Sequence, residues 1–154
     1  MNIRMAWQAD PGPAGRAEQA VRQALDVLIV DDQPAVRRGL IRLLQGLGLP
    51  GMRPVEAASL EQARARAQAC RPHLVLLDVD LAGDDGLELI PQLAPQSLVI
   101  VLSSHAGDAG TQARAQATGA AAVMHKGLPG PVLAAAIRDL LARRLPLSGS
   151  DARA

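Results

Sequence analysis

The chain has 154 residues, of which 49% are hydrophobic, which is sufficient for one domain with a substantial core. Its 16 basic and 15 acidic residues almost cancel, which argues against nucleic acid or an anionic membrane as a partner, and no apolar run reaches the roughly 18 residues of a transmembrane helix. A single cysteine excludes an internal disulfide and the N-terminus has no signal-peptide core, so we expect a cytoplasmic protein.

The two ends of the chain differ from its middle. Residues 1–24 are rich in Ala, Arg, Gln, Gly and Pro and lack a sustained apolar period, and the last residues are short and polar. We therefore predict a flexible N-terminal extension over 1–24, one domain over 25–145 and a flexible tail over 146–154.

Five apolar runs alternate with five helical patterns along the predicted domain. The expected strands are 26–31, 52–57, 73–78, 97–103 and 120–124, and the expected helices are 34–46, 59–70, 86–93, 108–118 and 128–144. Runs without polar alternation indicate strands buried on both faces, and the weaker run at 52–57 is expected at an edge. This alternation predicts an α/β fold, a doubly wound five-stranded parallel sheet.

Three details of the helices can also be predicted. Ser59 and Gln62 have the spacing of a capping box at the start of the second helix. Pro91 is expected to end or kink the third helix. The buried stripe of the last helix is predicted from its apolar spacing, and its members are Val132, Leu133, Ala136, Ile137, Leu140 and Leu141.

Polar side chains follow the apolar runs at four strand ends. In chain order they are Asp31 and Asp32, Asp78, Ser103 and Lys126. Each alone is compatible with a helix cap or a solvated group, but in a parallel sheet they converge on one edge. Two carboxylates about 4 Å apart repel by about 4 kcal/mol at an effective dielectric constant of about 20, and Mg²⁺ or Mn²⁺ relieves that repulsion. A nucleophile, metal ligands, a cation and a hydroxyl donor together favour attack by a carboxylate on phosphorus.

Five motifs occur in order over residues 26–144. They are Val27-Leu28-Ile29-Val30-Asp31-Asp32-Gln33-Pro34, Leu76-Leu77-Asp78, Gly86, Val101-Leu102-Ser103, and Gly119-Ala120 followed by Lys126. Together they resemble the receiver domain of two-component response regulators, and are most similar to the NarL type. The resemblance implies a flavodoxin-like fold with strand order 2-1-3-4-5.

The resemblance also implies a role for each site residue. Asp78 would be the phosphoacceptor. Asp31 and Asp32 would hold Mg²⁺ together with Asp78 and the backbone carbonyl of Asp80.

Two further residues would complete the site by the same resemblance. Ser103 would hydrogen-bond the phosphoryl group and Lys126 would pair with it. The phosphoryl group would come from a sensor histidine kinase, a phosphotransfer protein or a small phosphodonor.

The chain departs from the receiver pattern at several positions. Val123 stands where receivers usually carry Tyr or Phe, which puts the usual aromatic switch in doubt. Gly127 and Ala82 stand where proline is common. The Asp80 side chain adds a carboxylate beside the site, where it could alter metal affinity or remain a solvated loop charge.

The resemblance implies a signalling module in a phosphorelay and not an enzyme. Phosphorylation would bias the face formed by the helix at 108–118, the strand at 120–124 and the helix at 128–144, a candidate surface for a homodimer or another partner. We expect Ala113, Ala117, Val123 and Ile137 on this face.

Two questions remain open at the level of sequence. No helix-turn-helix follows the domain, so direct nucleic-acid binding is not expected, and the chain is either a stand-alone receiver or a piece of a larger regulator. The alternatives to a phosphorylated receiver are an interaction module that does not depend on phosphorylation, and a small phosphatase with an aspartyl nucleophile at Asp78-Val79-Asp80.

Overall fold

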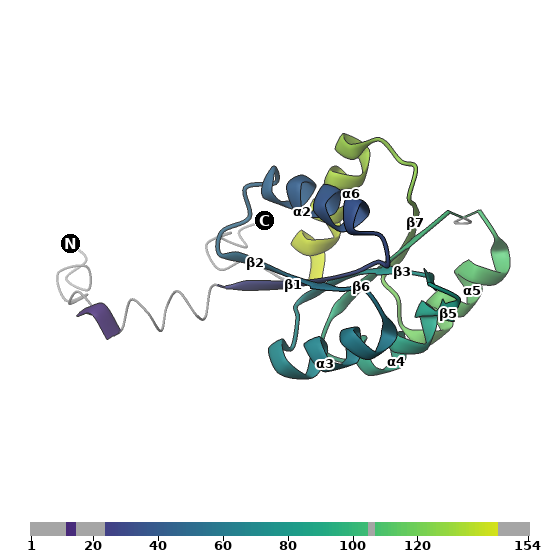
Figure 1. Cartoon of the computed structure of the whole chain (residues 1–154). Coiled ribbons are helices and arrows are strands. Elements are labelled where there is room, and N and C mark those ends of the chain that lie inside the picture. Colours follow the sequence, from purple (N-terminus) through teal and green to yellow (C-terminus); the bar gives the residue numbers. More distant parts are fainter. Residues whose placement is uncertain (1–11, 15–23, 105–106, 145–154) are drawn as a thin grey trace.

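The computed structural model of the chain describes residues 12–14, 24–104 and 107–144. These residues form a five-stranded parallel sheet in the order β2-β1-β3-β6-β7 (Figure 1). Its strands are β1 (Leu25–Val30), β2 (Met52–Ala57), β3 (Leu74–Asp78), β6 (Leu98–Ser103) and β7 (Ala122–His125). Numbered along the chain, this is the predicted order 2-1-3-4-5, and the predicted fold class is confirmed.

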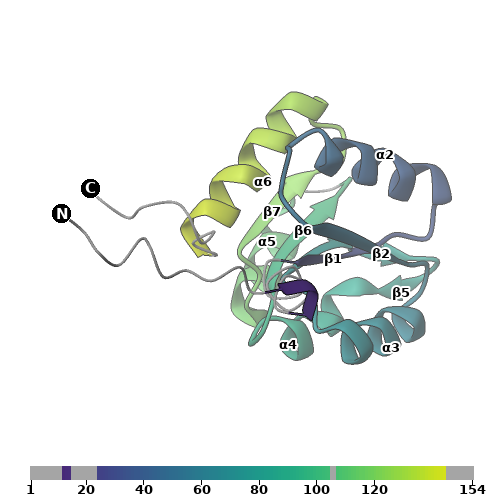
Figure 2. The ribbon, with the colours of Figure 1, turned by 90° about the vertical axis from the view of Figure 1, so that its left-hand side faces the viewer.

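Helices cover both faces of the sheet. On one face lie α2 (Pro34–Gln45) and α6 (Gly130–Arg144). On the other lie α3 (Leu60–Cys70), the short 3₁₀ helix η2 (Gly86–Leu89), α4 (Ile90–Leu93) and α5 (Ala109–Thr118) (Figures 1 and 2). Each crossover therefore returns the chain to the same edge of the sheet at the start of the next strand.

Alternate residues of the inner strands enter two separate hydrophobic clusters. Leu28 and Val30 of β1 join the cluster under α3, α4 and α5, whereas Val27 and Ile29 join the cluster under α2 and α6. All four are at most 1% exposed. Burial on both faces explains why these strands are continuous apolar runs, since each such side chain contributes roughly 1.5–3 kcal/mol when it leaves water.

The boundaries of α3 and α5 follow local capping. The Ser59 hydroxyl accepts a hydrogen bond from the Gln62 backbone N–H at 3.1 Å, and the Gln62 side chain accepts one from the Ala58 N–H at 2.8 Å. The predicted capping interaction is thus present, reaching one residue further back than the usual box. Asp108 caps α5, and Gly119 ends it at φ 111°, a left-handed conformation that suits glycine.

The segment after β3 differs from the prediction of one helix over 86–93. It consists of a hairpin, followed by η2 and α4. The strands of the hairpin, β4 (Asp80–Leu81) and β5 (Asp84–Asp85), have two residues each. Pro91 has no N–H to continue the hydrogen bonding of η2, so the helix is divided just before it. The hairpin turn places Ala82 at φ 54° and Gly83 at φ 94°, as a tight two-residue turn requires.

The last helix has a narrower buried stripe than predicted. Leu133, Ile137 and Leu141 are buried, but Val132 is 51% exposed. Ile137 is fully buried among residues of the α2–α6 cluster and is not part of an exposed face, which corrects its predicted place there. Leu140 is partly buried against the same cluster, so of the predicted stripe Val132 is the residue that points to solvent.

The predicted extension and tail cannot be placed, because all of 1–24 except 12–14 and Ala24, and all of 146–154, lie outside the described residues. Within the described ranges, no helix has the length and apolarity needed to cross a membrane.

Candidate functional site

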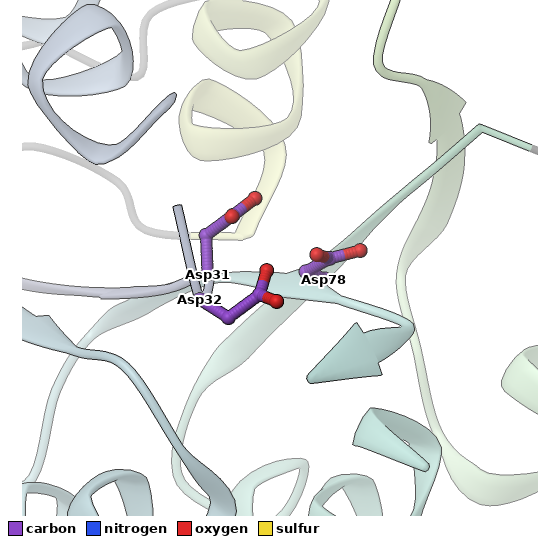
Figure 3. A group of neighbouring side chains, drawn as sticks. All are labelled: Asp31, Asp32 and Asp78. Carbon is purple, nitrogen blue, oxygen red and sulfur yellow. The ribbon is translucent and has the colours of Figure 1, made fainter. Parts of the chain in front are cut away.

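Three carboxyl groups gather at the carboxyl ends of β1 and β3 (Figure 3). Asp31 and Asp32 directly follow β1, and Asp78 is the last residue of β3, which pairs with β1 in parallel register. Each offers an oxygen within 4.8 Å of the others. Asp31 and Asp78 are buried at 1% and 6% exposure, whereas Asp32 is half-buried.

Lys126 bridges two of these carboxylates. Its Nζ lies 2.7 Å from Asp31 Oδ2 and 2.9 Å from Asp78 Oδ2. The lysine follows β7, and its backbone N–H donates to the Ser103 carbonyl at 3.0 Å. Ser103 is buried at the end of β6, between β3 and β7. The structure therefore brings Asp31, Asp32, Asp78, Ser103 and Lys126 to one edge of the sheet, as their strand-end positions predict.

The electrostatics of the site follow from burial and proximity. Burial raises the pKa of Asp78, and the nearby Asp31 charge raises it further, although the hydrogen bond and charge of Lys126 oppose both effects. Burial by itself lowers the pKa of Lys126, but the hydrogen bonds and charges of Asp31 and Asp78 outweigh it, so that pKa is raised. Lys126 is thus held as a cation between two carboxylates.

The turn after β1 is held at several points. The Asp31 N–H donates to the Ala57 carbonyl at 3.1 Å, and the Gln33 N–H donates to Asp31 Oδ1 at 2.8 Å. Arg37 in the first turn of α2 donates through Nη1 to the Asp31 carbonyl at 2.7 Å. Sequence reasoning missed Arg37, because an arginine near a helix start resembles a solvated charge and no pattern in the sequence marks its contact with Asp31.

The loop after Asp78 packs closely against the site. The Asp80 N–H donates to Asp78 Oδ1 at 3.3 Å, and the Gly86 N–H donates to the Val79 carbonyl at 2.6 Å. A Cβ at Gly86 would overlap the Asp78 carbonyl oxygen, so the close approach needs glycine. The Asp80 side chain is exposed and accepts a hydrogen bond from the Gly83 N–H at 3.0 Å.

Val123 lies in β7 opposite Val101 of β6. It is partly buried and packs against the cluster under α3, α4 and α5. A branched aliphatic side chain therefore fills the position that the sequence analysis singled out as lacking an aromatic ring.

A cavity of about 470 Å³ lies near the other edge of the sheet, where β3 and β6 begin. It is lined by residues of α3, of α4 and of the turns before those strands, including Arg64, Arg71 and Ser97. None of its lining residues belongs to the acidic group, so the candidate site is the carboxylate cluster and not this cavity.

Comparisons with known proteins agree with this geometry. The family model described as the response regulator receiver domain matches residues 27–138. The chain is 37% identical to the transcriptional activator protein ExaE of Pseudomonas putida, over 77% of this chain and 56% of that protein. It is 36% identical to the DNA-binding transcriptional activator DevR/DosR of Mycobacterium tuberculosis, over 83% of this chain and 59% of that protein.

The chain therefore belongs to the response regulator receiver domain family, and it spans little more than half the length of these two curated relatives. Among solved structures, it resembles the receiver domain of the putative response regulator NarL from Mycobacterium tuberculosis, with a TM-score of 0.69 at 25% identity over 79% of this chain and 99% of that one. The BeF3-activated receiver domain of Klebsiella pneumoniae RstA gives a TM-score of 0.66 at 27% identity, over 75% and 97% of the two chains.

The acidic group also fits the metal that receiver domains typically bind. Its donors are carboxylate oxygens, which Mg²⁺ prefers, and Asp32 leaves one side open to solvent. The three carboxylates and the Lys126 ammonium sum to a charge of about −2, which one divalent cation balances.

Proposed function

We propose that this chain is a phosphorylatable receiver in a two-component phosphorelay, which accepts a phosphoryl group on Asp78 from a sensor histidine kinase or a phosphotransfer protein. In this proposal Asp31, Asp32, Asp78 and the backbone carbonyl of Asp80 hold Mg²⁺. The observation that carries it is the buried Asp78 carboxylate beside Asp31 and Lys126, in a chain of the receiver family. We expect the protein to act in the cytoplasm as a signalling protein and not as an enzyme.

The transfer itself is a displacement at phosphorus. An Asp78 carboxylate oxygen forms a bond to phosphorus, while the bond from phosphorus to the donor histidine nitrogen breaks and its electron pair leaves with the imidazole. Mg²⁺, when bound, neutralises charge on the phosphoryl oxygens. Lys126 exchanges its contact with Asp78 for one with the phosphoryl group, and Ser103 supplies a hydroxyl donor from the adjacent strand end.

The output of the proposed switch is a protein-interaction surface. The added phosphoryl group carries about −1.5 to −2 charges and would draw Ser103 toward Asp78. This change would bias the face formed by α5, β7 and α6, where Ala113 and Ala117 are exposed and where we expect a homodimer to form. No nucleic-acid contact is proposed for this chain, because its charges nearly cancel.

Val123 favours a second candidate, an interaction module of the receiver type that does not depend on phosphorylation. An aromatic ring at this position is the usual readout of phosphorylation in receivers, and a partly buried valine cannot swing between an inward and an outward position in the same way. The phosphatase alternative has no comparable observation in its favour.

The first test is the intact mass of the protein after incubation with Mg²⁺ and acetyl phosphate, alongside Asp78→Asn. We expect one phosphoryl adduct on the wild type, none on the variant, and none when EDTA replaces Mg²⁺. If the wild type gains no adduct either from acetyl phosphate or from phosphorylated histidine kinases, the phosphorylated receiver is rejected in favour of the interaction module. Steady release of phosphate from a small phosphomonoester would instead support the phosphatase.

A further inference from the structure

Arg37 connects three elements beside the acidic group. It lies in the first turn of α2, and its side chain is only 14% exposed. One end of its guanidinium, Nη1, donates to the Asp31 carbonyl at 2.7 Å. Its Nε donates to Glu56 Oε1 at 2.9 Å, on the neighbouring strand β2. Both contacts have the short distances of charge-assisted hydrogen bonds.

The Asp31 carbonyl belongs to the peptide group that joins Asp31 to Asp32. Fixing this oxygen fixes the orientation of that peptide plane, because the peptide unit is rigid. Both carboxylate side chains branch from the two Cα atoms that bound the plane. A donor on the Asp31 carbonyl therefore constrains where both metal-binding carboxylates point.

We propose that Arg37 is a positioning residue that holds the Asp31–Asp32 turn in the geometry that binds Mg²⁺, and that Glu56 orients Arg37. This inference rests on the proposed function, since it concerns the same metal site. Arg37 itself does not contact the metal. Partners of this kind, which orient the ligands, typically contribute 10- to 100-fold to metal affinity.

A purely electrostatic role makes the opposite prediction. A guanidinium near the acidic group repels a divalent cation, so removal of its charge alone would tighten Mg²⁺ binding. Loss of positioning weakens Mg²⁺ binding instead. The sign of the change in affinity therefore separates the two roles.

The experiment measures Mg²⁺ affinity of the unphosphorylated protein by isothermal titration calorimetry. We expect Arg37→Met to weaken binding about 10-fold, and Arg37→Lys, which keeps the charge but not the fork of donors, to weaken it less. Glu56→Gln is expected to weaken binding to a smaller degree than Arg37→Met. The matched control is Arg38→Met, which removes the same charge from an exposed neighbour on α2 and should leave the affinity unchanged.

Two further measurements test the positioning role, and the first of them does not depend on activity. In metal-free protein, the amide hydrogens of Asp32 and Gln33 should exchange faster in Arg37→Met than in Arg38→Met. Phosphorylation from acetyl phosphate should be slowed in Arg37→Met at low Mg²⁺ and restored at saturating Mg²⁺. If Arg37→Met does not fold, Arg37→Lys and Glu56→Gln are compared with the wild type in the same way.

The outcomes are distinct. Equal or tighter Mg²⁺ binding in Arg37→Met than in the wild type overturns the positioning role and leaves the proposed function intact. If the wild type itself binds no Mg²⁺, the proposed function fails, and this inference fails with it.

Discussion

Asp78 keeps a carboxyl group at 6% exposure beside a second buried carboxyl group, that of Asp31. Such an arrangement is unfavourable for folding unless opposite charge compensates it, and Lys126 does so only in part, since the pKa of Asp78 remains raised. The residue proposed to react is therefore one that the fold holds at some expense of stability, as is common at functional sites.

This cost predicts the effect of Asp78→Asn on stability. Well below the ordinary Asp pKa of about 3.9, the carboxyl group is protonated in both the folded and the unfolded chain, and the wild type and variant should melt alike. As the pH rises from the ordinary pKa through the raised one, the unfolded chain ionises first and the wild type loses stability. At pH 7 in EDTA, Asp78→Asn should melt a few degrees higher by differential scanning calorimetry.

A control for this measurement is Asp26→Asn, also at a buried aspartate. Asp26 accepts two hydrogen bonds from Arg53, at 2.8 and 3.1 Å, so its replacement should lower the melting temperature. A melting temperature of Asp78→Asn below that of the wild type at pH 7 would contradict the expectation that burial of the Asp78 charge outweighs its interactions with Lys126.

The convergence of Asp31, Asp78 and Lys126 could be predicted because parallel strands bring their ends to one edge whatever the details of packing. The Arg37 contact could not, because it depends on the rotamer of one side chain and on Glu56 in a strand distant in sequence. Residues at the ends of parallel strands can thus be predicted from the pattern of strands, whereas a residue that contacts them from a neighbouring helix cannot.

At the scale of the elements, the loop that joins β3 to η2 leaves no room for a side chain where η2 begins, at Gly86. Gly86→Ala should destabilise the fold by roughly 2–4 kcal/mol, because the new methyl group would displace the Asp78 carbonyl and the hydrogen bond from Gly86 to Val79. Urea unfolding would measure the change. Phosphorylation of the folded fraction should also fall, since Asp78 would move.

Gly39→Ala is the matched control for Gly86→Ala. Gly39 lies inside α2, and a Cβ there would meet nothing within 4 Å. Alanine in a helix is favoured over glycine by up to about 1 kcal/mol, so this variant should be as stable as the wild type or more stable. Equal effects of the two substitutions would show that the steric conflict at Gly86 is relieved by a small shift of the loop.

The start of α3 gives a second prediction at this scale. Ser59→Ala removes the cap on the Gln62 N–H and should cost about 1 kcal/mol, measured by urea unfolding. Ser104→Ala, at an exposed position outside any helix start, should change stability by less than about 0.5 kcal/mol. A loss at Ser59 no larger than that at Ser104 would mean that the Gln62 side chain and water replace the cap.

The type of each main helix and strand could be predicted from the period of its apolar residues, but two details of the segment after β3 could not. The hairpin β4–β5 has strands of two residues each, which are too short to show any period. The helix expected over 86–93 is divided into η2 and α4 because Pro91 lies in the first turn of α4. The same sequence is also compatible with one helix in which Pro91 lies further inside, so the division could not be predicted.

At the scale of the whole molecule, the proposed dimer predicts a change in mass on activation. With Mg²⁺ and BeF3, the ligand named for the activated receiver domain of RstA, the wild type should shift from monomer to dimer in sedimentation equilibrium. Ala117→Arg on α5 should remain monomeric. Ala65→Arg, at an alanine of α3 that is also exposed, should dimerise as the wild type does.

Two results would contradict this surface. Dimerisation of Ala117→Arg would place the interface elsewhere, and a wild-type monomer in BeF3 would leave the α5–β7–α6 face to a different partner. The burial of Ile137 reduces the apolar area available there, so we expect a reversible dimer in the micromolar range rather than a permanent one.

The two hydrophobic clusters share no side chain, because successive residues of each inner strand point to opposite faces of the sheet. A substitution under α2 and α6 can therefore reach the packing under α3, α4 and α5 only through the strand backbones that both clusters share. We therefore expect the two helical layers to tolerate substitutions largely independently of each other, with the strand backbones in common. A lineage could remodel the layer of α3, α4 and α5 for a new partner while α2, whose Arg37 contacts the Asp31 carbonyl, stayed as it was.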